Sequence, residues 1–150
     1  MLYQGGAFPE HFNGHCIAPN GRHSAMRWST VELRTSTFAT RAAGDFVTTS
    51  DIWFRPVDST VGPDGALYVA DWYDYNISHS SPKNHSQWYQ PSRDDGRVWR
   101  VAPGNVPPIG AVQRLPDRSN SELVKLLSHP NDWLRATGSA SLRGAARQVN

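Results

Sequence analysis

Cysteine is almost absent from this sequence, because Cys16 is the single one among 150 residues. A lone thiol cannot close an internal disulfide, which excludes a disulfide framework. Long apolar runs are missing too, and no stretch approaches the length needed to span a membrane. Residues 1–6 have no basic stretch followed by an apolar core, so we do not expect them to be a signal peptide.

An excess of charge of one sign is also lacking. The sequence has 15 Lys and Arg against 13 Asp and Glu, a formal net charge of +2. No cluster of basic residues forms a stripe, so the charge does not argue for nucleic-acid binding. Turn formers and aromatics are present instead, with 12 Gly, 11 Pro, 6 Trp and 5 Tyr. This composition favours a turn-rich β protein, because aromatic side chains pack well across strands.

Residues 54–75, FRPVDSTVGPDGALYVADWYDY, predict two strands joined by a tight turn. The first strand, at 55–61, alternates loosely in polarity, as half-buried strands do. The turn GPDG at 62–65 combines a proline that fixes φ, an aspartate that can bond its own backbone and a glycine that tolerates positive φ. The apolar run 66–70 predicts the second strand, and GRVWRV at 96–101 predicts a third.

Residues 3–50 follow a similar course, which indicates an internal repeat. A turn is expected at 9–14, and strands are expected at 3–7, 15–18, 26–33 and 37–47. The polar stretch 76–95 predicts a long surface loop.

The last part of the chain predicts a pair of helices. Ser119 or Ser121 caps the first helix, whose apolar stripe is Leu123, Val124, Leu126 and Leu127. The second helix starts at Asn131 or Asp132. Gly138 and Gly144 each weaken it by roughly 1 kcal/mol relative to Ala, so we expect its C-terminal end to fray.

The motifs WFRPV, VGPDGALYVADWYD and GRVWRV resemble one β-propeller blade of glucose/sorbosone dehydrogenase-like quinoproteins. Together with LVKLLSHPNDWLR they resemble more closely the "membrane-bound dehydrogenase domain" proteins of planctomycetes. In those proteins a propeller precedes HEAT-type helical repeats and a c-type haem domain.

The resemblance implies a mainly β fold, a partial β-propeller with about two blades of a six-bladed ring, followed by a short α-helical hairpin of HEAT type. The propeller blades would occupy residues 1–103, a linker 104–118, and a first, incomplete HEAT-like repeat 119–150. Because two blades alone would leave both terminal sheet faces in water, we expect the chain to be a fragment of a longer protein.

The function implied by the resemblance is that of a secreted sugar or alcohol dehydrogenase that uses pyrroloquinoline quinone (PQQ). Its partners would be a sugar or other polyol substrate, the rest of its own propeller, and a c-type haem domain that receives the electrons. The protein would be periplasmic or extracellular. The family's catalytic His belongs to an early blade, so we assign no catalytic residue and expect this chain alone to be inactive. The alternative is a non-catalytic propeller–HEAT scaffold that binds carbohydrate or protein partners, because fold alone does not decide function.

Three residues are candidate cofactor contacts by the resemblance. Arg55 matches the second arginine of an Arg-x-Arg-Asp element that grips the PQQ carboxylates, and Arg binds carboxylates bidentately. Its alternative is a strand-edge arginine paired with Asp58 or Asp45. Arg22 matches a basic loop residue and is alternatively a solvated turn charge. Asp71 ends an inner strand near the ligand face and alternatively caps a turn or binds backbone N–H groups.

Other aromatic and histidine residues carry weaker signals. Trp72 and Tyr73 are either stacking platforms or packing residues. No metal site is predicted, because the spacing of His11, His15, Cys16 and His23 matches no zinc pattern. His79 and His85 could join a metal or cofactor site, although exposed loop histidines are commoner.

Overall fold

The computed structural model describes residues 1–74, 96–107 and 115–147. The predicted loop at 76–95, with His79 and His85, lies outside the described residues. The chain divides into two compact units, and each is described by itself. The first unit comprises Met1, His15–Thr60 and Tyr68–Trp99, and the second comprises Leu2–Gly14, Val61–Leu67 and Arg100–Asn150.

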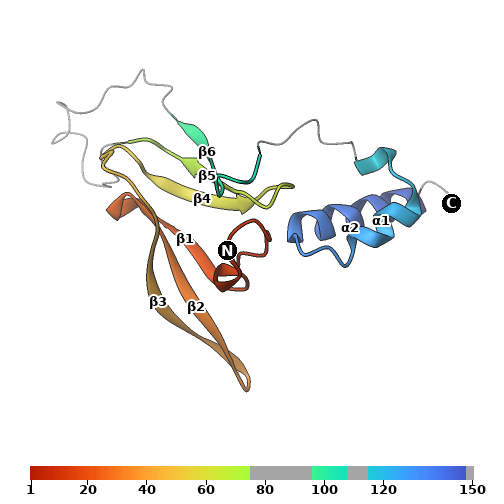
Figure 1. The fold of residues 1–150 in the computed structure, drawn as a ribbon, viewed down its shortest axis with the longest axis horizontal. Coiled ribbons are helices and arrows are strands. Elements are labelled where there is room, and N and C mark those ends of the chain that lie inside the picture. The colour runs from red at the N-terminus through yellow and green to blue at the C-terminus, as the bar shows by residue number, and fades with distance from the viewer. Residues whose placement is uncertain (75–95, 108–114, 148–150) are drawn as a thin grey trace. The chain divides into compact units, whose positions relative to one another are not determined.

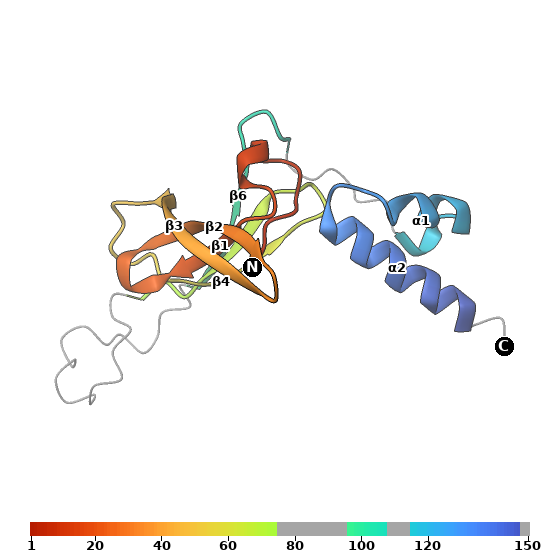
Figure 2. The same ribbon diagram turned by 90° about the horizontal axis from the view of Figure 1, so that it is seen from below.

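The first sheet contains three antiparallel strands in the order β1-β2-β3 (Figure 1). They are β1 (Cys16–Asn20), β2 (Ala25–Arg34) and β3 (Thr37–Thr48). This confirms the strands predicted at 15–18, 26–33 and 37–47. The β2–β3 ladder runs from the pair Ala25↔Thr48 to the pair Arg34↔Thr37, with register shifts after Met26 and Trp28. β2 and β3 therefore form a long twisted ribbon, which Figures 1 and 2 both show.

The second sheet has the order β4-β5-β6 and is also antiparallel. Its strands are β4 (Pro56–Val61), β5 (Leu67–Asp71) and β6 (Arg97–Val101), as the sequence predicts. The turn between β4 and β5 closes with a 3.0 Å bond from Gly65 N to Gly62 O, and Asp64 Oδ1 accepts from Ala66 N at 3.2 Å. Gly65 has a φ of 77°, which explains why glycine is needed there.

The predicted strand at 3–7 is wrong. The phenolic oxygen of Tyr3 accepts hydrogen bonds from Ala7 N at 2.9 Å and from Phe8 N at 3.0 Å, so this segment curls around the Tyr3 side chain. Gly6 permits the curl with a φ of 74°. Only an isolated bridge at Leu2 remains of the predicted strand, and a 3-10 helix (Glu10–Phe12) follows.

Two helices follow, α1 (Asn120–Leu126) and α2 (Asp132–Arg147). The first begins with the expected cap, because Ser119 accepts a hydrogen bond from Glu122 N and the Glu122 carboxylate accepts one from Ser119 N. The two helices and a 3-10 turn (Leu115–Asp117) share a small core. It comprises Leu115, Leu123 and Leu126, with Trp133 and Leu142 packed against it.

The expected fraying is wrong for the residues up to Arg147, because α2 continues through both glycines to that residue; residues 148–150 lie outside the described residues. A Cβ atom at Gly138 would lie 3.0 Å from Leu126 Cβ. The missing side chain therefore lets the two helices approach closely, and tertiary packing outweighs the low helix propensity of glycine.

The structure is thus mainly β, with two three-stranded antiparallel sheets and two C-terminal helices. Neither sheet closes into a ring, and the propeller stays a prediction. Across the residues that the structure describes, no helix is long and apolar enough to cross a membrane.

Candidate functional site

The carboxylate of Asp71 is the centre of a hydrogen-bond cluster at the end of β5. Its side chain is almost fully buried, with 3% exposed. Oδ1 accepts from Arg55 N at 2.8 Å and from Tyr73 N at 2.9 Å, and Oδ2 accepts from Trp99 Nε1 at 2.7 Å. A buried carboxylate needs such partners to offset its desolvation. The alternative in which Asp71 binds backbone N–H groups is confirmed, and a cofactor contact for Asp71 stays a prediction.

Nη1 of the Arg55 guanidinium has two oxygen acceptors. Nη1 donates to Ser24 Oγ at 2.5 Å and to Phe54 O at 2.8 Å. Ser24 adopts a left-handed conformation, with a φ of 50°, in the connection between β1 and β2. Because Asp71 fixes the Arg55 backbone and Ser24 contacts the head group, both ends of this side chain are positioned. Asp45, proposed as an alternative partner of Arg55, forms an ion pair with Arg27 at 3.1 Å.

Arg22 is exposed and lies close in sequence to Ser24, which contacts Arg55. It belongs to a 3-10 helix (Gly21–His23) that directly precedes Ser24. Arg22 is therefore two residues from the serine that contacts Arg55. A solvated turn charge and a second cationic contact both fit this position, so the cofactor role of Arg22 stays a prediction.

Aromatic and guanidinium groups stack beside the Asp71 cluster, in what we call the aromatic ladder: Trp53, Tyr73, Arg97 and Trp99. The Trp53 and Tyr73 ring centroids are 6.0 Å apart with planes inclined by 30°. Arg97 Cζ lies 3.5 Å from the Tyr73 centroid and 5.8 Å from the Trp99 ring. These are cation–π distances. Tyr73 also has a φ of 54°, a strained conformation for a bulky residue, which the hydrogen bond to Asp71 helps to maintain.

The sequence interpretation missed Ser24, Trp53, Arg97 and Trp99 as members of this site. The alternation in RVWRV places Arg97 and Trp99 on one face of a strand and could have indicated part of the ladder. Tyr73 contacts Trp53 and Arg97 within the ladder, and the choice between packing between blades and a stacking platform for a ligand stays a prediction. Trp72, by contrast, is 66% exposed.

The histidines have structural neighbours in the described chain. His15 Nδ1 accepts a hydrogen bond from Val31 N at 3.2 Å, and the His11 ring lies 4.1 Å from that of Phe12. Among the residues that the structure describes, no group of three or more His, Cys, Asp or Glu could hold a metal ion.

Comparison with known families finds a match over the first part of the chain. The family model described as "Domain of unknown function (DUF7133)" matches residues 1–105. The chain belongs to the DUF7133 family. The match includes both sheets and every residue of the Asp71 cluster and aromatic ladder, whereas α1 and α2 lie beyond it. No curated protein and no solved structure matches the chain.

Proposed function

We propose that this DUF7133 domain is part of a β-propeller of the glucose/sorbosone dehydrogenase-like quinoprotein type, in which Arg55 helps to hold PQQ. The observation that carries the proposal is the positioned guanidinium of Arg55, bound at Nη1 by Ser24 and Phe54. A side chain that is already ordered loses less conformational freedom when it binds a carboxylate. The resemblance implies that the propeller is periplasmic or extracellular and that HEAT-type repeats and a c-type haem domain follow it in the whole protein.

The side chains of Arg55, Arg22 and Trp53 suit a planar, anionic group. Arg55 and Arg22 would hold carboxylates of PQQ, and bidentate guanidinium–carboxylate pairs are strong. Trp53 stands where the family motif has its first arginine, so part of the expected positive charge is replaced by an aromatic face. When bound, PQQ supplies the two-electron oxidation of a hydroxyl group of a sugar or polyol. The role of this chain's residues is then to bind and orient the cofactor.

The test is to titrate PQQ into the intact gene product that contains this sequence and to follow binding by the absorption spectrum. We expect saturable binding, and Arg55→Ala should weaken it by about tenfold to a hundredfold, the loss of a charge-assisted pair. Arg55→Lys keeps the charge but not the fork geometry and should give an intermediate loss. Arg27→Ala is the matched control, because Arg27 is exposed and paired with Asp45. Absence of PQQ binding, or equal weakening by Arg55→Ala and Arg27→Ala, contradicts the proposal.

The second candidate function is a non-catalytic scaffold that binds carbohydrate, and the aromatic ladder favours it. Trp99, whose ring lies 5.8 Å from Arg97 Cζ, is 42% exposed, and Trp72, which precedes Tyr73 of the ladder in the sequence, is 66% exposed. Aromatic rings with a polar group nearby suit ligands that are apolar on one face and polar at the edge. Saturable binding of oligosaccharides without reduction of a redox dye would favour this function. Trp72→Ala should weaken that binding, whereas Val98→Ala, at an exposed position without a ring, should not.

A further inference from the structure

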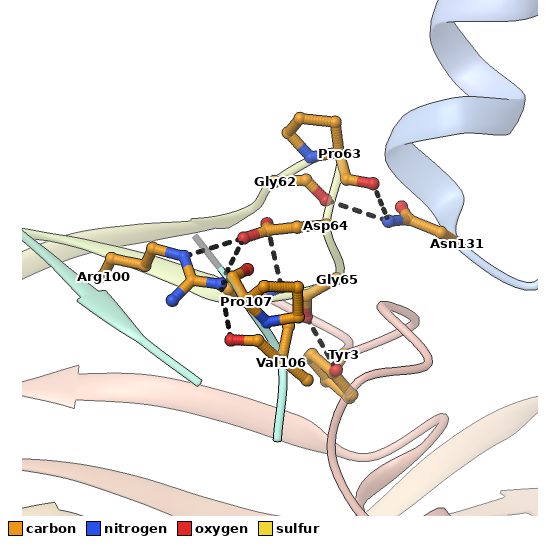
Figure 3. Close-up of polar contacts among 10 residues, drawn as sticks. Tyr3, Gly62, Pro63, Asp64, Gly65, Arg100, Val106, Pro107 and Asn131 are labelled. Atoms are coloured by element: carbon orange, nitrogen blue, oxygen red, sulfur yellow. Dashed lines mark hydrogen bonds and ion pairs between the residues drawn. The ribbon is translucent and has the colours of Figure 1, made fainter. Parts of the chain in front are cut away.

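The turn at 62–65 is contacted by three segments that are distant from it in sequence (Figure 3). All of the residues involved belong to the second compact unit. The first contact comes from Asn131, which is 2% exposed. Its Nδ2 donates to Gly62 O at 2.9 Å and to Pro63 O at 3.2 Å, a separation of 69 and 68 residues. Two carbonyls of the turn are thereby satisfied by the residue that precedes α2.

The N-terminal segment contacts the same turn. The hydroxyl of Tyr3, a fully buried residue, donates to Gly65 O at 2.8 Å. Gly5 approaches so closely that a Cβ atom there would collide with Gly65 O. The turn is therefore bound by a segment 62 residues earlier in the chain as well as by Asn131.

The end of β6, together with the segment after it, supplies a third contact. Arg100 Nη2 lies 2.7 Å from Asp64 Oδ2, with 26% and 11% of the two side chains exposed. The same Nη2 donates to Pro107 O at 2.7 Å and to Val106 O at 3.3 Å. A partly buried, charge-assisted pair of this kind is stronger than an exposed one.

The N-terminal segment and α2 are also joined directly. Asp132 N donates to Gln4 O at 2.8 Å, and Arg135 Nη2 donates to Gln4 Oε1 at 2.6 Å. Each of the three segments, namely the turn, the N-terminal segment and the start of α2, is therefore hydrogen-bonded to the other two.

The helical segment has little to stabilise it alone. Residues 115–147 are fewer than the roughly 40 below which a chain usually needs disulfides, metals or a partner. Their core contains three buried side chains, Leu115, Leu123 and Leu126. Helices of this length are marginal without tertiary packing.

We propose that the 62–65 turn is the docking site for the helical segment, so that the described residues 2–14, 61–67, 100–107 and 115–147 fold as one cooperative unit. The partner of the turn is thus a segment of the same chain that lies beyond the DUF7133 match. The end of that match at residue 105 is not a folding boundary. A change at any one contact of the turn is transmitted to the other two segments.

Asn131→Asp separates docking from capping. Oδ1 of Asn131 accepts from Trp133 N at 2.8 Å, and an aspartate keeps this helix cap. It loses the Nδ2 donor and places an oxygen against the carbonyls of Gly62 and Pro63. We expect amide hydrogen exchange of the full chain to lose protection by tenfold or more, on the order of one lost buried hydrogen bond, in both α2 and residues 2–14. Amides of the β2–β3 ladder, in the other unit, serve as the internal reference, and Asn120→Asp, at an exposed position, is the control.

If Asn131→Asp unfolds the whole chain, Tyr3→Phe tests the proposal through the contact that the N-terminal segment makes with the turn. The hydroxyl of Tyr3 bonds to the turn and to its own segment, yet the proposal expects protection of the α2 amides to fall as well. Unchanged protection of the α2 amides in Tyr3→Phe would overturn the proposal.

Discussion

The indole of Trp99 donates a 2.7 Å hydrogen bond to Asp71, 28 residues earlier in the chain. The same carboxylate accepts hydrogen bonds from the backbone N–H groups of Arg55 and Tyr73. The Asp71 side chain therefore connects three places: the residue before β4, the segment that follows β5, and strand β6. Asp71 thereby fixes the backbone from which the Arg55 and Tyr73 side chains extend.

Asp71→Asn should destabilise the protein strongly, because an amide nitrogen would face donors that now meet a carboxylate oxygen. We expect a loss of about 2–4 kcal/mol in the free energy of unfolding, measured by urea denaturation. The control is Asp58→Asn, at an exposed position, which should stay within about 0.5 kcal/mol of the parent. Equal effects of the two substitutions would contradict the role assigned to Asp71.

Two glycines with nearly the same φ allow steric contact to be separated from backbone conformation. Gly65 has a φ of 77° and Gly14 one of 75°, but a Cβ atom meets nothing within 4 Å at Gly14 and collides with Gly5 O at Gly65. Gly14→Ala should cost about 1–2 kcal/mol for the left-handed conformation alone. Gly65→Ala should cost about 1–3 kcal/mol more, because the backbone must shift. Thermal or urea unfolding of both variants measures the difference, and similar losses would show that the close approach is relieved at little cost.

Tyr3 should make stability fall at alkaline pH. Burial of its hydroxyl raises the pKa above the ordinary value of 10.0, and the hydrogen bonds from Phe8 and Ala7 oppose this only in part. Above about pH 10 the unfolded chain releases the Tyr3 proton while the folded chain keeps it, so stability present below that pH is lost as the pH rises. Tyr3→Phe should remove this part of the pH dependence, measured as the difference in unfolding free energy between the two proteins from about pH 8 to pH 11. Parallel curves would contradict the prediction.

The capping box of α1 should weaken in acid. The Ser119 hydroxyl and backbone N–H hold the pKa of Glu122 below its ordinary value of 4.5. The cap is therefore complete above about pH 4.5 and is lost as the pH falls through the lowered pKa. In Ser119→Ala the pKa of Glu122 should rise toward 4.5, as observed by NMR titration of the side-chain carboxyl carbon. Ser128→Ala, which lies outside the box, should leave that pKa unchanged.

The sequence by itself determined the features that depend on neighbouring residues. The GPDG turn, the strands on either side of it and the cap at Ser119 follow from local φ preferences and from side-chain bonds to nearby backbone groups. These interactions span few residues, so a pattern in the sequence is sufficient to predict them.

Only the tertiary structure decided which distant residues meet. The sequence analysis predicts a strand at 3–7, but the Tyr3 hydroxyl bonds to Gly65, Ala7 and Phe8, and the segment curls instead. By its helix propensity Gly138 should destabilise α2, but in the structure it lies against Leu126 and permits close packing of the two helices. The contacts of Arg55 with Ser24 and of Asn131 with the turn span 31 and 69 residues. No local preference encodes such pairs, because they form only when the packed chain brings the segments together.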